Sequence, residues 1–328
     1  MNLNRHITID ANRLSLDQAL LMQTPEVSQS EVLALINRFN DRVSSLLLTS
    51  YDQRELRVTK DKIRRVIRCE RNLVESQISR EKPTSAMVAG TLLDACFAIH
   101  ASGGKLEDPI KDALSFLSAL GEDLDIDPYV EELVRVKVEE GCNKLVDFWN
   151  ADAIKEKFSL RLQDRIAISF DNARLQLIGR PDVVLSALDS NNEDAVIIDV
   201  KSGTPKMFDV EDAHLYALME TLRSHRPPSL IGNYYLAFDQ LELIAPSLQL
   251  LEEEANRTLG AIAKMVKIVN TKTAKAVRSV ELCQFCSINS TCTEVTEDDR
   301  LGWGTPEQPI YIENPHVAPI GAQASSGD

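Results

Sequence analysis

The middle of the chain limits the possible folds most, because two strand-like runs flank a polar turn there. The runs are residues 174–188 (RLQLIGRPDVVLSAL) and 194–203 (DAVIIDVKSG), and the turn is DSNNED. Apolar and β-branched residues bounded by turn-forming residues are typical of strands. The pattern predicts an antiparallel hairpin centred between Ser190 and Asn191.

This register gives the two faces of the hairpin different characters. Asp182 falls opposite Asp199, and Lys201 shares their face because side chains alternate along a strand. A slip of one residue would reverse the faces. The opposite face is uniformly apolar and is the expected core side; it carries Val183, Leu185, Val196, Ile198 and Val200.

The facing pair of Asp182 and Asp199 costs folding energy, since carboxylates about 5 Å apart repel. A bound divalent cation such as Mg²⁺, which prefers carboxylate oxygens, removes the repulsion. Lys201 could orient a metal-bound water or stabilise charge on a phosphate. The alternative is an ordinary solvent-exposed face, but the run VIIDVK is almost wholly apolar, which indicates burial. The arrangement therefore favours metal-assisted phosphodiester hydrolysis.

Periodicity predicts helices before and after this hairpin, so the expected fold class is mixed α/β with central strands. We divide the chain into an N-terminal helical extension (1–54), a helical region (55–156), a core (157–296) and a flexible tail (297–328). Thr59 is the predicted N-cap of the second helix. Strands are expected at 165–170 and, singly or as a pair, at 229–245. Helices are expected over 27–50, 59–68, 85–100, 106–120, 128–150, 207–224 and 248–270.

The segments Gly179-Arg180-Pro181-Asp182 and Asp199-Val200-Lys201 resemble the signature of the PD-(D/E)xK nuclease superfamily. The resemblance implies a restriction-endonuclease-like mixed central sheet flanked by helices. It implies that Asp182, Asp199 and the carbonyl of Val200 bind Mg²⁺ or Mn²⁺, with Lys201 as the catalytic lysine.

Two further segments are similar to motifs of the RecB-like members. Residues 212–216 (DAHLY) resemble the QxxxY motif, with Asp212 in the place of glutamine and Tyr216 matching, which adds both to the expected site. Residues 90–94 resemble a G-x-x-x-H pattern, with Asp94 in the place of histidine. Asp94 is either a third metal ligand or an ordinary polar residue of its helix. His100 lies near in sequence, but its spacing differs.

The late cysteines Cys283, Cys286 and Cys292 form a C-x2-C-x5-C motif. Three thiols within ten residues indicate a metal centre that needs a fourth ligand, either for zinc or for an iron–sulfur cluster. Cys96 and Cys142 fit core thiols better. Cys69 follows several arginines, a setting that favours the thiolate.

One early cysteine followed by a late C-x2-C-x5-C resembles the iron–sulfur branch of these nucleases, which includes AddB-type nucleases and the CRISPR-associated adaptation nuclease. Residues 55–295 carry the resemblance. It implies a structural [4Fe–4S] cluster held by Cys69, Cys283, Cys286 and Cys292, joining the first and last helices; zinc is the alternative.

The formal net charge of −14 argues against binding nucleic acid through overall charge. A local basic run over residues 54–71 is either a phosphate-contacting strip or a solvated helix face. Without an export signal, a membrane span or a phosphate-binding ATPase loop, we expect a cytoplasmic enzyme that relies on a separate helicase or other repair or defence proteins. The prediction is a Mg²⁺- or Mn²⁺-dependent DNA nuclease, an exonuclease rather than an endonuclease. Alternatives are a catalytically silent DNA-binding or adaptor module and a zinc-stabilised scaffold.

Overall fold

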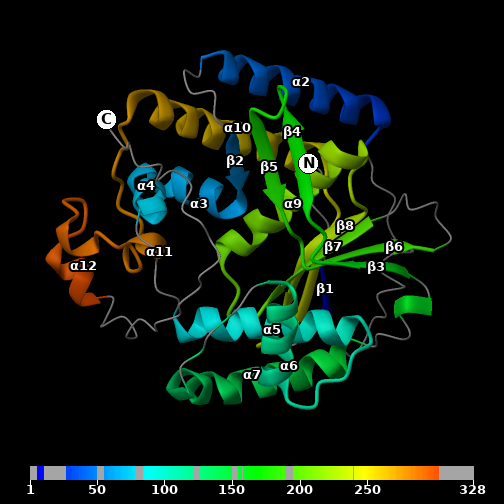
Figure 1. Cartoon of the computed structure of the whole chain (residues 1–328). Coiled ribbons are helices and arrows are strands. Elements are labelled where there is room, and N and C mark those ends of the chain that lie inside the picture. Colours follow the sequence, from blue (N-terminus) through cyan, green and yellow to red (C-terminus); the bar gives the residue numbers. More distant parts are fainter. Residues whose placement is uncertain are drawn as a thin grey trace, which may run out of the picture.

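A computed structural model gives the fold, with a central sheet between two layers of helices (Figure 1). The structure describes residues 6–10, 27–49, 55–78, 84–121, 124, 126, 128–149, 154–156, 158–188, 195–238 and 240–302. The expected mixed α/β architecture with flanking helices is confirmed. Among the helices within these ranges, none has the length and apolar content that crossing a bilayer requires.

The central sheet has six strands in the order β1-β9-β8-β7-β6-β3. The β7 and β8 strands are parallel and the other neighbours are antiparallel, so the sheet is mixed. In chain order the strands are β1 (His6–Asp10), β3 (Phe158–Leu162), β6 (Val183–Ala187), β7 (Ala195–Lys201), β8 (Leu230–Tyr235) and β9 (Gln240–Ile244).

The predicted hairpin register is confirmed, with Val183 opposite Ile198 and Val184 opposite Ile197. The prediction that residues 174–188 form one strand is wrong. They divide into β5 (Leu175–Gly179) and β6, which lie in different sheets. Pro181 lies in the break, and a proline has no N–H with which to continue a ladder. The β5 strand joins β2 (Leu56–Thr59) and β4 (Ile166–Phe170) in a second sheet of order β2-β5-β4.

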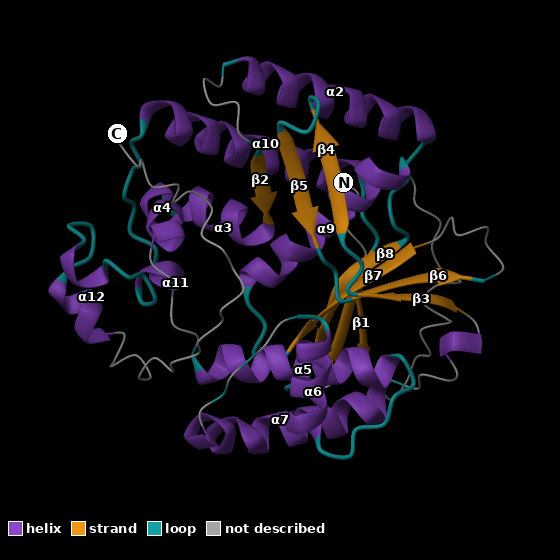
Figure 2. Ribbon diagram, viewed as in Figure 1, coloured by secondary structure: helices purple, strands orange, loops and turns teal. Residues whose placement is uncertain are grey.

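Three helices cover one face of the central sheet: α5 (Ser85–Ala101), α6 (Pro109–Ala119) and α7 (Pro128–Phe148), seen below it in Figure 2. The apolar face of the hairpin packs against them, as predicted. This lower core contains Val183, Leu185, Val196, Ile198 and Val200 from the sheet, and Cys96 and Cys142 from the helices. The interpretation of these two cysteines as core thiols is therefore consistent with their burial.

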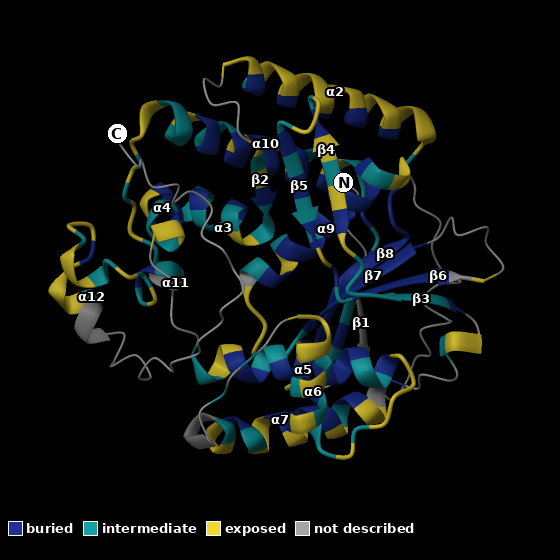
Figure 3. Ribbon diagram, in the orientation of Figure 1, coloured by how far each residue is buried: buried dark blue, intermediate teal, exposed yellow. Residues whose placement is uncertain are grey.

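The other face is covered by α9 (Met207–Ser224), and beyond it lie the second sheet, α10 (Leu248–Thr271) and α2 (Gln29–Leu48). The β7 and β8 strands are consequently buried on both faces, whereas α2 exposes its outer face (Figure 3). Two short helices, α3 (Lys60–Arg68) and α4 (Glu70–Ile78), lie beside α10. Thr59 caps α3 as predicted, because its side chain accepts a hydrogen bond from the Lys62 amide.

Strands β1, β2 and β3 were not predicted, because each is only four or five residues long and pairs with a partner remote in the chain. The helical reading of residues 1–54 is thus wrong for β1, which pairs with β9. The expected loose tail begins with a helix, α12 (Glu297–Gly302), and its remainder lies outside the described residues. The domain boundaries themselves stay a prediction.

Candidate active site

The hairpin of β6 and β7 brings the two central carboxylates together on the face that α9 covers. Asp182 directly precedes β6, and its Oδ2 accepts a hydrogen bond of 2.7 Å from the Val200 amide. Asp199 lies within β7 and is only 2% exposed. The Val200 amide therefore fixes the Asp182 carboxylate beside Asp199, while the part of the Val200 carbonyl stays a prediction.

Lys201 closes this site at the end of β7. Its Nζ forms an ion pair with Asp199 and lies 3.3 Å from Asp212 Oδ2 and 3.7 Å from Asp209 Oδ1. The structure thus brings Asp182, Asp199 and Lys201 together, as the alternation of side chains requires.

The α9 helix contributes three polar side chains that are each almost fully buried. Asp209 and Asp212 face Lys201, and the Tyr216 hydroxyl donates a hydrogen bond of 3.0 Å to the Arg180 carbonyl. Asp212 and Tyr216, one helical turn apart, share the face of α9 that meets the site. Asp209 was missed, although it stands three residues before Asp212 on this face.

Close approach of α9 also explains the glycine before the Arg180-Pro181-Asp182 segment. A Cβ atom on Gly179 would lie 2.8 Å from Met219 Sδ and 3.0 Å from the Tyr216 ring. Only a residue without a side chain lets β5 end directly under this helix.

The α5 helix places Asp94 at the edge of the same site. A Cβ on Gly90 would lie 3.5 Å from the Ser202 Oγ, so α5 passes the end of β7 one turn before Asp94. Asp94 interacts electrostatically with Asp182 and Asp199. His100 lies farther along α5, where its Nε2 is 2.9 Å from the Trp149 carbonyl oxygen.

Two cationic side chains of α3, Lys60 and Arg64, also reach the site. The sequence had identified them only as members of the basic run over residues 54–71. Lys60 Nζ lies 3.5 Å from both Asp199 Oδ2 and Asp212 Oδ2. Arg64 lies 3.2 Å from Asp212 Oδ2 and its guanidinium covers the Phe208 ring. The sequence signal for Lys60 was the predicted cap at Thr59, which makes Lys60 the first residue of the helix.

The pKa values of the two central carboxyl groups, Asp182 and Asp199, are shifted in opposite directions. Burial raises the pKa of Asp182 well above its usual range, and the charges of Asp199 and Asp94 raise it further. Burial also raises the pKa of Asp199, but the ammonium groups of Lys60 and Lys201 outweigh it and bring that pKa below its usual range. Burial, with the Asp199 charge, raises the pKa of Asp94 to about 7. An added cation would favour ionisation of all three.

The carboxylates fit a hard divalent cation in their chemistry. Asp199 Oδ2 is buried without a hydrogen bond and forms ion pairs with the ammonium groups of Lys60 and Lys201, so it already attracts positive charge. Oxygen ligands of this kind are those Mg²⁺ and Mn²⁺ prefer. Within the described ranges, no three His, Cys, Asp or Glu side chains are arranged to hold a metal ion as they stand.

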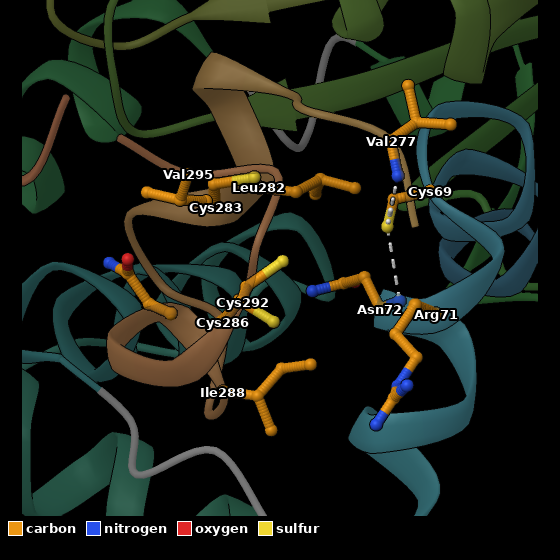
Figure 4. A pocket seen from close by; sticks show the side chains of 11 residues that line it. Cys69, Arg71, Asn72, Val277, Leu282, Cys283, Cys286, Ile288, Cys292 and Val295 are labelled. Carbon is orange, nitrogen blue, oxygen red and sulfur yellow. Dashed lines mark hydrogen bonds between the residues drawn. The ribbon is translucent and has the colours of Figure 1, made fainter. Parts of the chain in front are cut away.

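The four predicted cysteine ligands line a separate pocket between α3 and the segment after α10 (Figure 4). Cys69 follows α3, Cys283 ends α11 (Val280–Cys283), and Cys292 follows a short 3₁₀ turn (Asn289–Thr291). Backbone amides donate to two of the sulfurs, from Asn72 and Val277 to Cys69 and from Ser279 to Cys283. Thiolates favour such donors. Cys69 therefore shares a pocket with the distant motif, while a bound cluster is not shown.

Fold and site together define an α/β protein with a carboxylate pair and a lysine on adjacent strands of a mixed sheet. The family model described as the PD-(D/E)XK nuclease superfamily matches residues 60–293, and the chain belongs to that superfamily. Its members are usually nucleases, which gives a nuclease-type function. No curated protein matches this chain.

Proposed function

We propose that this chain is a Mg²⁺- or Mn²⁺-dependent deoxyribonuclease that hydrolyses phosphodiester bonds. The observation that carries the proposal is the facing of Asp182 and Asp199 across β6 and β7 with Lys201 on the same face. Two buried carboxyl groups that face each other are costly to ionise together unless a cation balances them. Membership of the nuclease superfamily supports the same chemistry.

The roles of the residues follow from their charges and places. Asp182 and Asp199, with Asp94 and the Val200 carbonyl, would hold the cation, which when bound supplies Lewis-acid activation of a water and the phosphate. Lys201 would stabilise charge that develops on the phosphate oxygens. Asp212 holds the Lys201 ammonium at 3.3 Å, and Tyr216 anchors the backbone of the Arg180-Pro181-Asp182 segment.

The decisive test is cleavage of labelled single- and double-stranded DNA by the wild type and by Asp199→Asn, with Mg²⁺, Mn²⁺ or EDTA. Cleavage should require the divalent cation and fall by at least a hundredfold in the variant, because a cation ligand is lost. Asp41→Asn, on the exposed face of α2, is the matched control and should cut like the wild type. Equal cutting by Asp199→Asn, or cutting in EDTA, would overturn the proposal.

The preference for DNA ends belongs to this proposal and rests on the resemblance to RecB-like members. Free-ended and end-blocked single strands of one sequence separate the two activities. An exonuclease digests only the free-ended strand, and equal digestion of both would make the chain an endonuclease.

A second candidate function is a catalytically silent DNA-binding or adaptor module of the same fold. The observation that favours it is the Lys201 ammonium, which is already surrounded by Asp199, Asp209 and Asp212. Such a module would bind DNA without cutting it under every cation. Cation-dependent cleavage that Asp199→Asn abolishes would exclude it.

We also propose that Cys69, Cys283, Cys286 and Cys292 hold a structural [4Fe–4S] cluster, with zinc as the alternative. Four thiols from segments about two hundred residues apart line one pocket, and soft thiolates are the ligands of both centres. Bound there, the centre would join the end of α3 to the segment that follows α10. Burial raises the pKa of the Cys283 thiol, and a bound metal would reverse this by ionising it.

Metal analysis of anaerobically purified protein tests the cluster, together with absorbance near 400 nm. Iron and sulfide with that absorbance support the cluster, and zinc without it supports the alternative. Cys283→Ser should lose the metal and lower the melting temperature, whereas Cys96→Ser should keep the metal. Purified protein that contains neither iron nor zinc would refute both proposed centres.

The cellular setting is the remaining part of the proposal. All six cysteines are free, which fits the reducing cytoplasm. Because the sequence has no recognisable ATPase loop, duplex ends would be opened by a separate helicase, in repair, recombination or defence against foreign DNA. Co-purification of the chain from native cells, followed by identification of bound ATPases, tests this expectation.

A further inference from the structure

The second sheet positions Lys60, a residue outside the family motifs, at the active site. The β2 and β5 strands are parallel, with Thr59 opposite Ile178, so the segments that follow the two strands leave the sheet at the same end. The β5 strand continues into Gly179, Arg180, Pro181 and Asp182, whereas β2 continues into Lys60 at the start of α3. Lys60 and Asp182 therefore reach the site from adjacent parallel strands.

Lys60 lies on the open side of the carboxylates. Its Nζ is 3.5 Å from Asp199 Oδ2 and 5.2 Å from the centre of the Tyr216 ring. The Lys60 side chain is 33% exposed, against 17% for Lys201 and 2% for Asp199. Of these three side chains, Lys60 is therefore the most accessible to a ligand that approaches from solvent.

The other cations described in α3 have different partners. Arg65 pairs with Asp61, Arg68 pairs with Glu211, and the Lys62 ammonium donates to the Arg57 carbonyl. Arg64 contacts Asp212 but makes no ion pair with Asp199. Among the contacts shown for the described residues, Lys60 is the cation of α3 that pairs with Asp199, so the basic run reaches the carboxylate pair through the first residue of this helix.

We propose that the Lys60 ammonium binds the phosphodiester that is cut, as a second substrate cation beside Lys201. The inference rests on the proposed nuclease function. A divalent cation on Asp182 and Asp199 would take over the negative charge that Lys60 balances at 3.5 Å. The freed ammonium then has a phosphate oxygen as its natural partner, and a partly exposed lysine on a flexible stem can follow it.

Kinetics of Lys60→Ala and Lys60→Arg test this role, with Lys62→Ala as the matched control on the same helix. We expect kcat/KM to fall about ten- to one-hundredfold in Lys60→Ala, the value of one charged hydrogen bond. Lys60→Arg should recover most of the loss, because it restores the cation. The control should retain the wild-type kinetics, and matching melting temperatures would show that all variants fold.

Salt dependence of DNA binding gives a readout that a purely structural lysine would not change. With Ca²⁺ as the probe cation, the slope of log affinity against log salt should decrease by about 0.7 in Lys60→Ala for single-stranded DNA. The control should keep the wild-type slope. An unchanged slope, or loss of activity that Lys60→Arg does not recover, would overturn the inference and leave Lys60 as a structural counter-ion. Failure of the wild type to cut DNA would instead refute the proposed function.

Discussion

Most charged residues of the site are held by groups of the opposite sign, and Asp182 is held by the Val200 amide. Lys201 contacts three aspartates, and Asp212 contacts Lys60, Lys201 and Arg64. Removal of one member leaves a buried charge without its partner, which costs more than the pair contributes to stability. The side chains are thus fixed before any ligand arrives, as a preorganised site requires.

Gly179 gives a prediction about this arrangement, because it shapes the contact between β5 and α9. In Gly179→Ala the new methyl group would lie 2.8 Å from Met219 Sδ, and the free energy of unfolding should fall by about 1–3 kcal/mol. Gly260→Ala is the control, since no atom lies within 4 Å of its Cβ and it occupies the interior of α10. It should raise the free energy of unfolding by about 0.5–1 kcal/mol. Urea denaturation of both variants checks the opposite signs.

At the scale of elements, the site lies where two sheets and three helices (α3, α5 and α9) converge. The parallel pair of β2 and β5 sets the start of α3, and the hairpin of β6 and β7 sets the carboxylates. The α9 helix packs over both, and α5 passes the end of β7. No single element contains a complete site. The activity should therefore depend on where each element begins, including the start of α3 at Lys60.

The N-cap of α3 tests that requirement. Thr59→Ala removes the acceptor for the Lys62 amide and should lower the free energy of unfolding by about 1 kcal/mol. It should also lower cleavage activity, because Lys60 is the first residue of the helix. Ser247→Ala removes the equivalent cap of α10, far from the carboxylates, and should cost similar stability with activity retained. Equal activity in the two variants would show that the α3 terminus need not be fixed.

At the scale of the whole molecule, the central sheet separates two cores. The lower core joins the sheet to α5, α6 and α7, whereas the upper core joins it to α2, α9, α10 and the second sheet. The α2 helix precedes the segment matched by the family model, yet its apolar face belongs to the upper core. Residues outside the matched segment therefore contribute to the stability of the nuclease fold.

Truncation of a core side chain of α2 measures this contribution. Phe39 is 1% exposed and its ring packs against Phe170, with centroids 5.6 Å apart. Phe39→Ala should lower the free energy of unfolding by about 3–5 kcal/mol. Arg38→Ala removes an ion pair to Glu252 on the exposed side of the same helix and should cost less than about 1 kcal/mol. Similar losses in both variants would contradict an integral role for α2.

The sequence was sufficient to predict features that depend on local alternation. The polar turn and the period of two placed Val183 opposite Ile198, and one uniformly apolar face identified the side that packs in the lower core, although the opposite face is buried as well. Helix periodicity and a capping threonine similarly predicted α3. These features could be predicted because their partners are near in the chain and one periodicity determines them.

The tertiary structure alone decided which distant residues meet. It brought Lys60 to the carboxylates and divided residues 174–188 between two sheets. The approach of Asp94 to the carboxylates and of Cys69 to Cys283 had been implied only by the family resemblance, not by any periodicity. The physical reason is that these meetings depend on parallel strand pairing and on the packing of helices across the sheet. Neither leaves a periodic signal in the sequence, because each is set by the shape of the whole core.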